Sequence, residues 1–104
     1  MSFRRYEILL PTRYNDGSPV PPEKIDEVLQ DLAARFGGVT FRPEHLLGVW
    51  LYENRRFEEH SVCFVTDVED TDENAQFFSA YKQTLKERFR QLDIWIVSYE
   101  IHIT

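Results

Sequence analysis

The chain begins with an alternation of apolar and other residues, a period of two that is typical of a β-strand. Tyr6, Ile8 and Leu10 fall on one face of this predicted strand, and Leu9 falls on the other. Pro11 ends it, because proline lacks the backbone N–H that a sheet ladder uses. The first element is therefore a short strand with one apolar face.

The same period predicts three further strands, at residues 46–52, 60–68 and 94–103. Residues 54–59 predict a polar connection between the middle two strands, longer than a two-residue turn. The strand after this connection is apolar on both faces, which is typical of a central strand. In the last strand, Ile94 and Ile96 share one face and Trp95 lies on the other.

Two other segments show the helical spacing of apolar residues that marks an amphipathic helix. The first helix follows the proline pair 21–22 and ends at the glycine pair 37–38. The second begins at Asp70, which we expect to cap it with Glu73 as a capping-box partner. Its predicted apolar stripe consists of Phe78, Tyr81, Leu85, Phe89 and Leu92.

The predicted order of elements is β-α-β-β-α-β. This order is typical of the ferredoxin-like α+β fold, in which two helices pack on one face of a four-stranded antiparallel sheet. A chain of 104 residues with 42% apolar residues can fill one core, so we expect a single domain over residues 1–104.

Composition excludes some classes of function. The formal net charge of −6 argues against a nucleic-acid partner, because such affinity comes largely from Lys and Arg. Cys63 is the single cysteine and can form no intrachain disulfide, and the spacing of the three histidines predicts no metal site. No leader or membrane-spanning run is apparent, so we expect a cytoplasmic protein without a cofactor.

Both faces of the predicted sheet are apolar, although a face without helices is normally polar. An exposed apolar face of this kind marks an interface or a ligand groove. We therefore expect a homodimer through the sheet. The interface candidates are Leu9, Trp50, Tyr52, Ile94 and Ile96. Two alternatives stay open: the first connection folds back over this patch, or the predicted strand register is wrong by one residue.

The connection after the first strand holds the candidate ligand-binding residues Arg13, Tyr14 and Asp16. Loops at strand ends often carry functional residues. Asn15 and Asp16 before Gly17 are also typical of an Asx turn, and we favour that interpretation of these three positions. A turn alone accounts for neither Arg13 nor Tyr14, so these two are the strongest candidates for binding a small molecule.

Three stretches resemble a group of small bacterial single-domain proteins that has no assigned function. They are "YEILLPTRYNDGSPV" (residues 6–20), "RFGG" (35–38) and "LKERFRQLDIW" (85–95). The resemblance spans the chain and implies a ferredoxin-like fold, but it implies no reaction, ligand or catalytic residue.

We therefore favour a non-enzymatic small-ligand or protein-interaction module that acts as a homodimer. The main alternative is a small dimeric ferredoxin-like enzyme for a small polar substrate, in which Arg13, Tyr14 and Asp16 act with His45 or His60. A third alternative, a ferredoxin-like nuclease or toxin with Asp16 as a metal ligand, is disfavoured because the chain is acidic and has no basic stripe.

Overall fold

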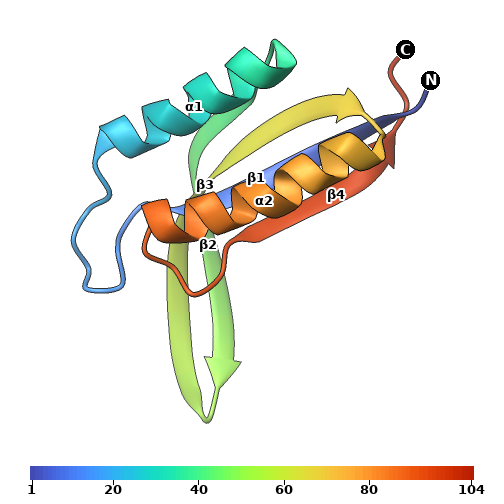
Figure 1. Ribbon diagram of the computed structural model, residues 1–104. Helices are drawn as coiled ribbons and strands as arrows, with labels where there is room; N and C mark the ends of the chain where they lie inside the picture. Colours follow the sequence, from blue (N-terminus) through green and yellow to red (C-terminus); the bar gives the residue numbers. More distant parts are fainter.

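A computed structural model describes the backbone of residues 1–104 and every side chain except that of His45. The elements are β1 (Phe3–Pro11), α1 (Pro22–Phe36), β2 (Thr40–Tyr52), β3 (Arg55–Glu69), α2 (Asp72–Arg88) and β4 (Trp95–Ile101). All strand pairs are antiparallel, and the sheet order is β2-β3-β1-β4. Both helices lie on one face of this sheet (Figure 1). The predicted ferredoxin-like fold is confirmed.

The core lies between the helices and the sheet. Ile8 and Leu10 of β1 and Phe64 of β3 are fully buried there, as the alternation in the sequence predicts. The Tyr6 ring stacks on Phe78 of α2, with 3.8 Å between ring centroids. No helix among the described residues is long and apolar enough to cross a membrane.

In the last strand, β4, the side chains on the uncovered face of the sheet are not the ones that the predicted interface requires. Leu9 pairs with Trp95 and Ile8 pairs with Ile96, so Trp95 shares the uncovered face with Leu9. Ile96 packs against the core, and Ile94 is only 2% exposed. Ile94 and Ile96 are therefore core residues, and their assignment to the interface was wrong by one position in register.

The uncovered face is also more polar than predicted. Arg5 donates two hydrogen bonds to Asp67 (2.8 and 3.0 Å), and Tyr99 donates one to Glu7 (3.1 Å). These long side chains stand beside two short apolar residues of β3, Cys63 and Val65, which stay buried. Because long polar side chains can cover apolar neighbours with their stems, the middle of this face offers no apolar patch.

The ends of the helices confirm one prediction and correct two. Gly37 takes the left-handed conformation (φ 81°) after α1, as expected. Thr71, not Asp70, caps α2, since its hydroxyl accepts the Asn74 N–H. Leu92 lies beyond the end of α2 and is exposed, so it is not part of the buried stripe.

The connection between β2 and β3 is shorter than predicted. Glu53 and Asn54 alone form the turn, with φ values of 50° and 62°. Two consecutive positive φ angles are typical of the tight turns that join hairpin strands. Residues 55–59 therefore belong to β3, and Trp50 pairs with Phe57 across the hairpin.

Candidate functional site

The β2–β3 hairpin extends well beyond the rest of the sheet. Pro11, the last residue of β1, pairs with Ser61, so residues 46–60 continue as a ribbon of only two strands. We call residues 46–60 the arm; it projects away from the helices and from β4 (Figure 1). It contributes to the 46 Å length of the molecule.

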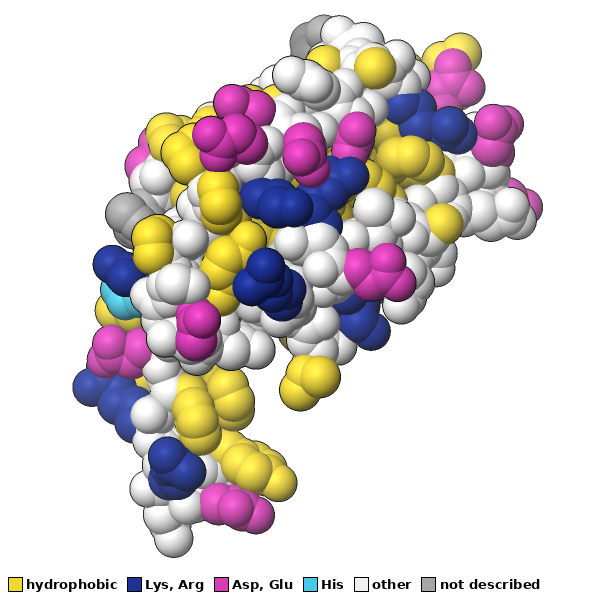
Figure 2. Space-filling model, turned by 60° about the vertical axis from the view of Figure 1, so that its left-hand side comes forward, with side chains coloured by type: hydrophobic (Ala, Val, Ile, Leu, Met, Phe, Trp, Pro, Cys, Tyr) yellow, Lys and Arg dark blue, Asp and Glu magenta, His cyan; other side chains and the backbone are white. Residues whose placement is uncertain are grey.

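The arm is rich in exposed apolar side chains. They are Leu46, Leu47, Val49, Trp50, Leu51 and Tyr52. Alternation along β2 divides them between two faces: Leu46, Trp50 and Tyr52 on one, and Leu47, Val49 and Leu51 on the other. Figure 2 shows hydrophobic side chains gathered on the projecting part of the molecule.

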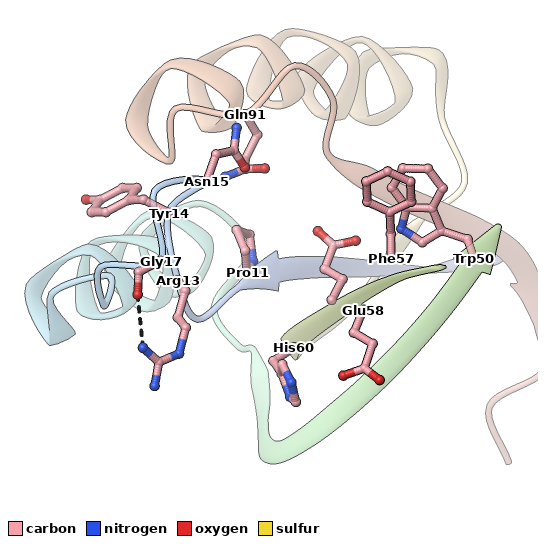
Figure 3. A pocket seen from close by; sticks show the side chains of 11 residues that line it. Pro11, Arg13, Tyr14, Asn15, Gly17, Trp50, Phe57, Glu58, His60 and Gln91 are labelled. Carbon is pink, nitrogen blue, oxygen red and sulfur yellow. Dashed lines mark hydrogen bonds between the residues drawn. The ribbon is translucent and has the colours of Figure 1, made fainter. Parts of the chain in front are cut away.

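A cleft of about 430 Å³ lies where the arm leaves the sheet. Its lining comes from the connection after β1, from the arm and from the segment after α2. The lining residues are Pro11, Arg13, Tyr14, Asn15, Gly17, Trp50, Phe57, Glu58, Glu59, His60 and Gln91. Figure 3 shows Trp50 and Phe57 at one end and the Arg13–Asn15 segment at the other, with His60 between them.

Internal hydrogen bonds hold the loop side of the cleft. Arg13 donates to the carbonyl of Gly17 (3.0 Å), a bond that is drawn in Figure 3. The Tyr14 N–H donates to the Ser18 carbonyl (2.8 Å), and the Tyr14 carbonyl accepts the Gly17 N–H (2.9 Å). The Arg90 guanidinium lies over the Tyr14 ring, 4.7 Å from its centroid. The sequence-predicted residues Arg13 and Tyr14 are thus brought together in one cleft wall.

Asp16, the third predicted ligand-binding residue, bonds within its own loop. Its carboxylate accepts hydrogen bonds from the hydroxyl (2.5 Å) and the N–H (2.9 Å) of Ser18, which is the expected Asx turn. These bonds lower the pKa of the Asp16 carboxyl. Asp16 is not among the residues that line the cleft, so its contribution is to shape the loop.

The arm side of the cleft combines aromatic rings with carboxylates. The Trp50 and Phe57 rings are stacked, with centroids 4.4 Å apart and planes inclined by 14°. Glu58 is paired with Arg56 at 2.9 Å. Among the described side chains, the Glu59 carboxylate has no ion pair or hydrogen bond. Glu59 and Pro11 also border a second hollow of about 270 Å³, which Trp95 lines.

Candidate metal ligands are not grouped in the part of the chain that the structure describes. No three or more described His, Cys, Asp or Glu side chains are placed to hold one ion. His60 lines the cleft, whereas the side chain of His45 lies outside the described residues. Cys63 is buried as the sequence predicts, and burial raises the pKa of its thiol.

Comparison with known proteins identifies relatives of the fold. No family model matches the sequence, and no curated protein matches it significantly. The divalent cation tolerance protein CutA1 from Thermus thermophilus is 13% identical, with a TM-score of 0.66 over 98% of this chain and 86% of that one. For CutA1 from Oryza sativa the values are 8%, 0.68, 100% and 84%.

A phage SAM lyase in complex with S-methyl-5′-thioadenosine has a similar fold too. It is 16% identical, with a TM-score of 0.65 over 98% of this chain and 90% of that one. At such low identity, these likenesses show the fold alone. They support the small ferredoxin-like domain that the resemblance in the sequence implied.

Sequence patterns did not point to Phe57, Glu58, Glu59 or Gln91, which also line the cleft. Phe57, Glu58 and Glu59 were assigned to a polar connection, because the two-residue turn at Glu53 and Asn54 was not recognised. A turn at these two residues places Phe57 opposite Trp50, so the hairpin register was the missing signal. Gln91 follows α2 and carries no local signal of its own.

Proposed function

We propose that this protein is a homodimeric binding module that associates through the arm and holds a small organic ligand in the cleft beside it. The observation that carries this proposal is the exposed apolar arm. Trp50 and Tyr52, two of the predicted interface residues, belong to the arm but lie on the face opposite Leu47, Val49 and Leu51, through which we propose that two chains associate. Leu9, at the end of the sheet from which the arm projects, borders the adjacent hollow.

The arm needs support that one chain does not supply. A lone two-stranded hairpin is at best marginally stable in water, and three or more strands or a packed face are required. Leu47, Val49 and Leu51 form a face with exposed fractions of 55%, 48% and 75%. Contiguous exposed apolar residues of this kind mark interaction surfaces. A second copy of the chain offers the same stripe, so two arms can bury it mutually.

The cleft supports the second part of the proposal, the binding of a small ligand. Its volume of about 430 Å³ suits a small organic molecule. Ligand sites combine apolar surface with polar groups that fix the ligand's orientation. This lining joins the Trp50 and Phe57 rings to charged side chains and to the amides of Asn15 and Gln91. Trp50 lies on the opposite face of the arm from Val49, so self-association and ligand binding use different faces.

The test is the solution mass by light scattering across a dilution series. We expect a dimer for the natural chain and a monomer for Val49→Glu, because the new carboxylate would be buried without a partner. Leu92→Glu is the matched control, since Leu92 is also exposed but lies after α2 and outside the arm. A natural chain that is monomeric at every concentration, or a Val49→Glu variant that stays dimeric, would contradict the proposal.

A second candidate function is an enzyme that uses the same cleft. It is favoured by the presence of Arg13, Tyr14 and His60 in the lining of one cleft, and by the likeness of the fold to a phage SAM lyase. Incubation with S-adenosylmethionine, followed by chromatography for S-methyl-5′-thioadenosine, tests it. Product that disappears in the Arg13→Ala variant, with the fold intact, would favour the enzyme.

A further inference from the structure

Two features of the cleft bear on which ligand it takes, namely its aromatic end and the charges around it. Trp50 is 50% exposed although one of its faces is stacked on Phe57. An indole that keeps this much free surface beside a cleft can stack on a planar ring. Ring stacking contributes about 0.5–1.5 kcal/mol beyond the area that is buried.

Two carboxylates lie next to this aromatic pair, and only one of them has a cationic partner. Glu58 is neutralised by Arg56, whereas Glu59 has no cationic partner among the described side chains. Glu59 shares an arm face with Trp50 and Phe57, because Gly48 pairs with Glu59 and Trp50 pairs with Phe57 in the same ladder. A free carboxylate therefore stands on the same side as the exposed indole.

The basic groups near the cleft are already engaged. Arg13 is turned toward the Gly17 carbonyl at the end remote from Trp50, as Figure 3 shows. Arg90 lies over Tyr14 and close enough to Asp16 to lower the pKa of that carboxyl. Arg55 lies over the Phe57 ring at 5.5 Å, so this aromatic pair already accepts a cation from its own chain.

We infer that the cleft selects a planar aromatic molecule that carries a positive charge. The ring stacks on Trp50, and the cationic group faces Glu59. Trp is the side chain that best attracts cations through its ring, and the carboxylate adds a direct ion pair in a partly enclosed site. This inference rests on the proposed binding function and names the class of ligand for the same cleft.

The experiment compares three indoles that share the same ring and two-carbon linker and differ in the terminal group and its charge. Tryptamine is cationic at neutral pH, tryptophol is neutral and indole-3-propionate is anionic. Each is titrated into ¹⁵N-labelled protein while the two tryptophan indole N–H signals are followed, with Trp95→Phe assigning the signals. Trp50 reports the cleft, and Trp95 reports the adjacent hollow.

We expect tryptamine to bind about tenfold more tightly than tryptophol, with indole-3-propionate weakest, because an ion pair and a cation–π contact are gained or lost along the series. Glu59→Gln should abolish the preference for tryptamine over tryptophol. Glu87→Gln is the matched control, since it removes one exposed carboxylate of α2 that is not among the residues that line the cleft. Trp50→Leu should weaken all three ligands.

Three results would overturn the inference: equal affinities across the series, an unchanged preference in Glu59→Gln, or shifts at Trp95 alone. Absence of binding by all three indoles would overturn it as well. The same samples are measured by light scattering, so a failure of the ligand class is distinguishable from a failure of self-association. A dimer that binds no indole would contradict only the proposed ligand class. A monomer that binds tryptamine would contradict only the proposed homodimer.

Discussion

At the scale of single residues, a partly buried polar network joins the two helices. Tyr81 is 7% exposed and donates a hydrogen bond to the Asp31 carboxylate at 2.9 Å. Arg88 donates to the same carboxylate at 2.9 Å and pairs with Glu27 at 3.2 Å. Burial first, and then the hydrogen bond to Asp31, raise the pKa of the Tyr81 hydroxyl.

This network gives stability a specific pH dependence. Below about pH 10, Tyr81 is protonated in both the folded and the unfolded chain. Above that pH only the unfolded chain ionises, so the stabilisation by Tyr81 is lost as pH rises further. We expect the difference in unfolding free energy between the natural chain and Tyr81→Phe to shrink between pH 8 and pH 11. Urea unfolding measures this difference, and the comparison isolates the Tyr81 hydroxyl because the other four tyrosines are present in both proteins. A constant difference would contradict this account.

At the scale of elements, the start of α2 shows how a contact distant in sequence selects between two adjacent capping residues. Asp70 and Thr71 both have side chains suited to the N-cap position. Arg4 of β1 forms a hydrogen bond with Asp70 at 2.9 Å, and the helix begins one residue later with Thr71 as its cap. Arg4 is 66 residues away in the chain, so no local pattern contains this information.

The cap predicts a measurable cost for one hydroxyl group. The Thr71 hydroxyl accepts the Asn74 N–H at 3.2 Å. Thr71→Ala should lower the free energy of unfolding by about 1 kcal/mol, which is typical for loss of a capping oxygen. Thr71→Ser keeps the oxygen and should change stability by less than half of that amount. Thermal or urea denaturation measures the stability of the two variants. Equal stability of Thr71→Ala and Thr71→Ser would show that the capping hydroxyl does not stabilise the helix.

The same distinction between local and distant information separates what the sequence predicts from what it does not. Alternation and helical spacing follow from local geometry, so the element order and the buried face of β1 were predictable. The face that β4 presents depends on its pairing with β1, and the prediction failed at Ile94 and Ile96. Arg13 and Tyr14, which were singled out because they follow a strand, line the cleft. Phe57 was missed because its position depends on hairpin register.

At the scale of the whole molecule, the layered domain and the arm differ in what supports them. The sheet beside the helices has four strands, with β1 and β3 at its centre and one face packed on the core. The arm has two strands and exposes apolar side chains on both faces. If the arm takes its support from a second copy, its order should depend on assembly, whereas the core should be independent of it.

Hydrogen exchange measures this difference amide by amide. In the natural chain at high concentration, we expect slow exchange for the paired amides of both the arm and β1. In the monomeric Val49→Glu variant, the arm amides should exchange at least about tenfold faster while those of β1 keep their protection, because only the arm loses its partner. The Leu92→Glu control should behave like the natural chain. Equal protection of the arm in the monomeric variant would show that the ribbon supports itself, and the apolar stripe of Leu47, Val49 and Leu51 would then need a different partner.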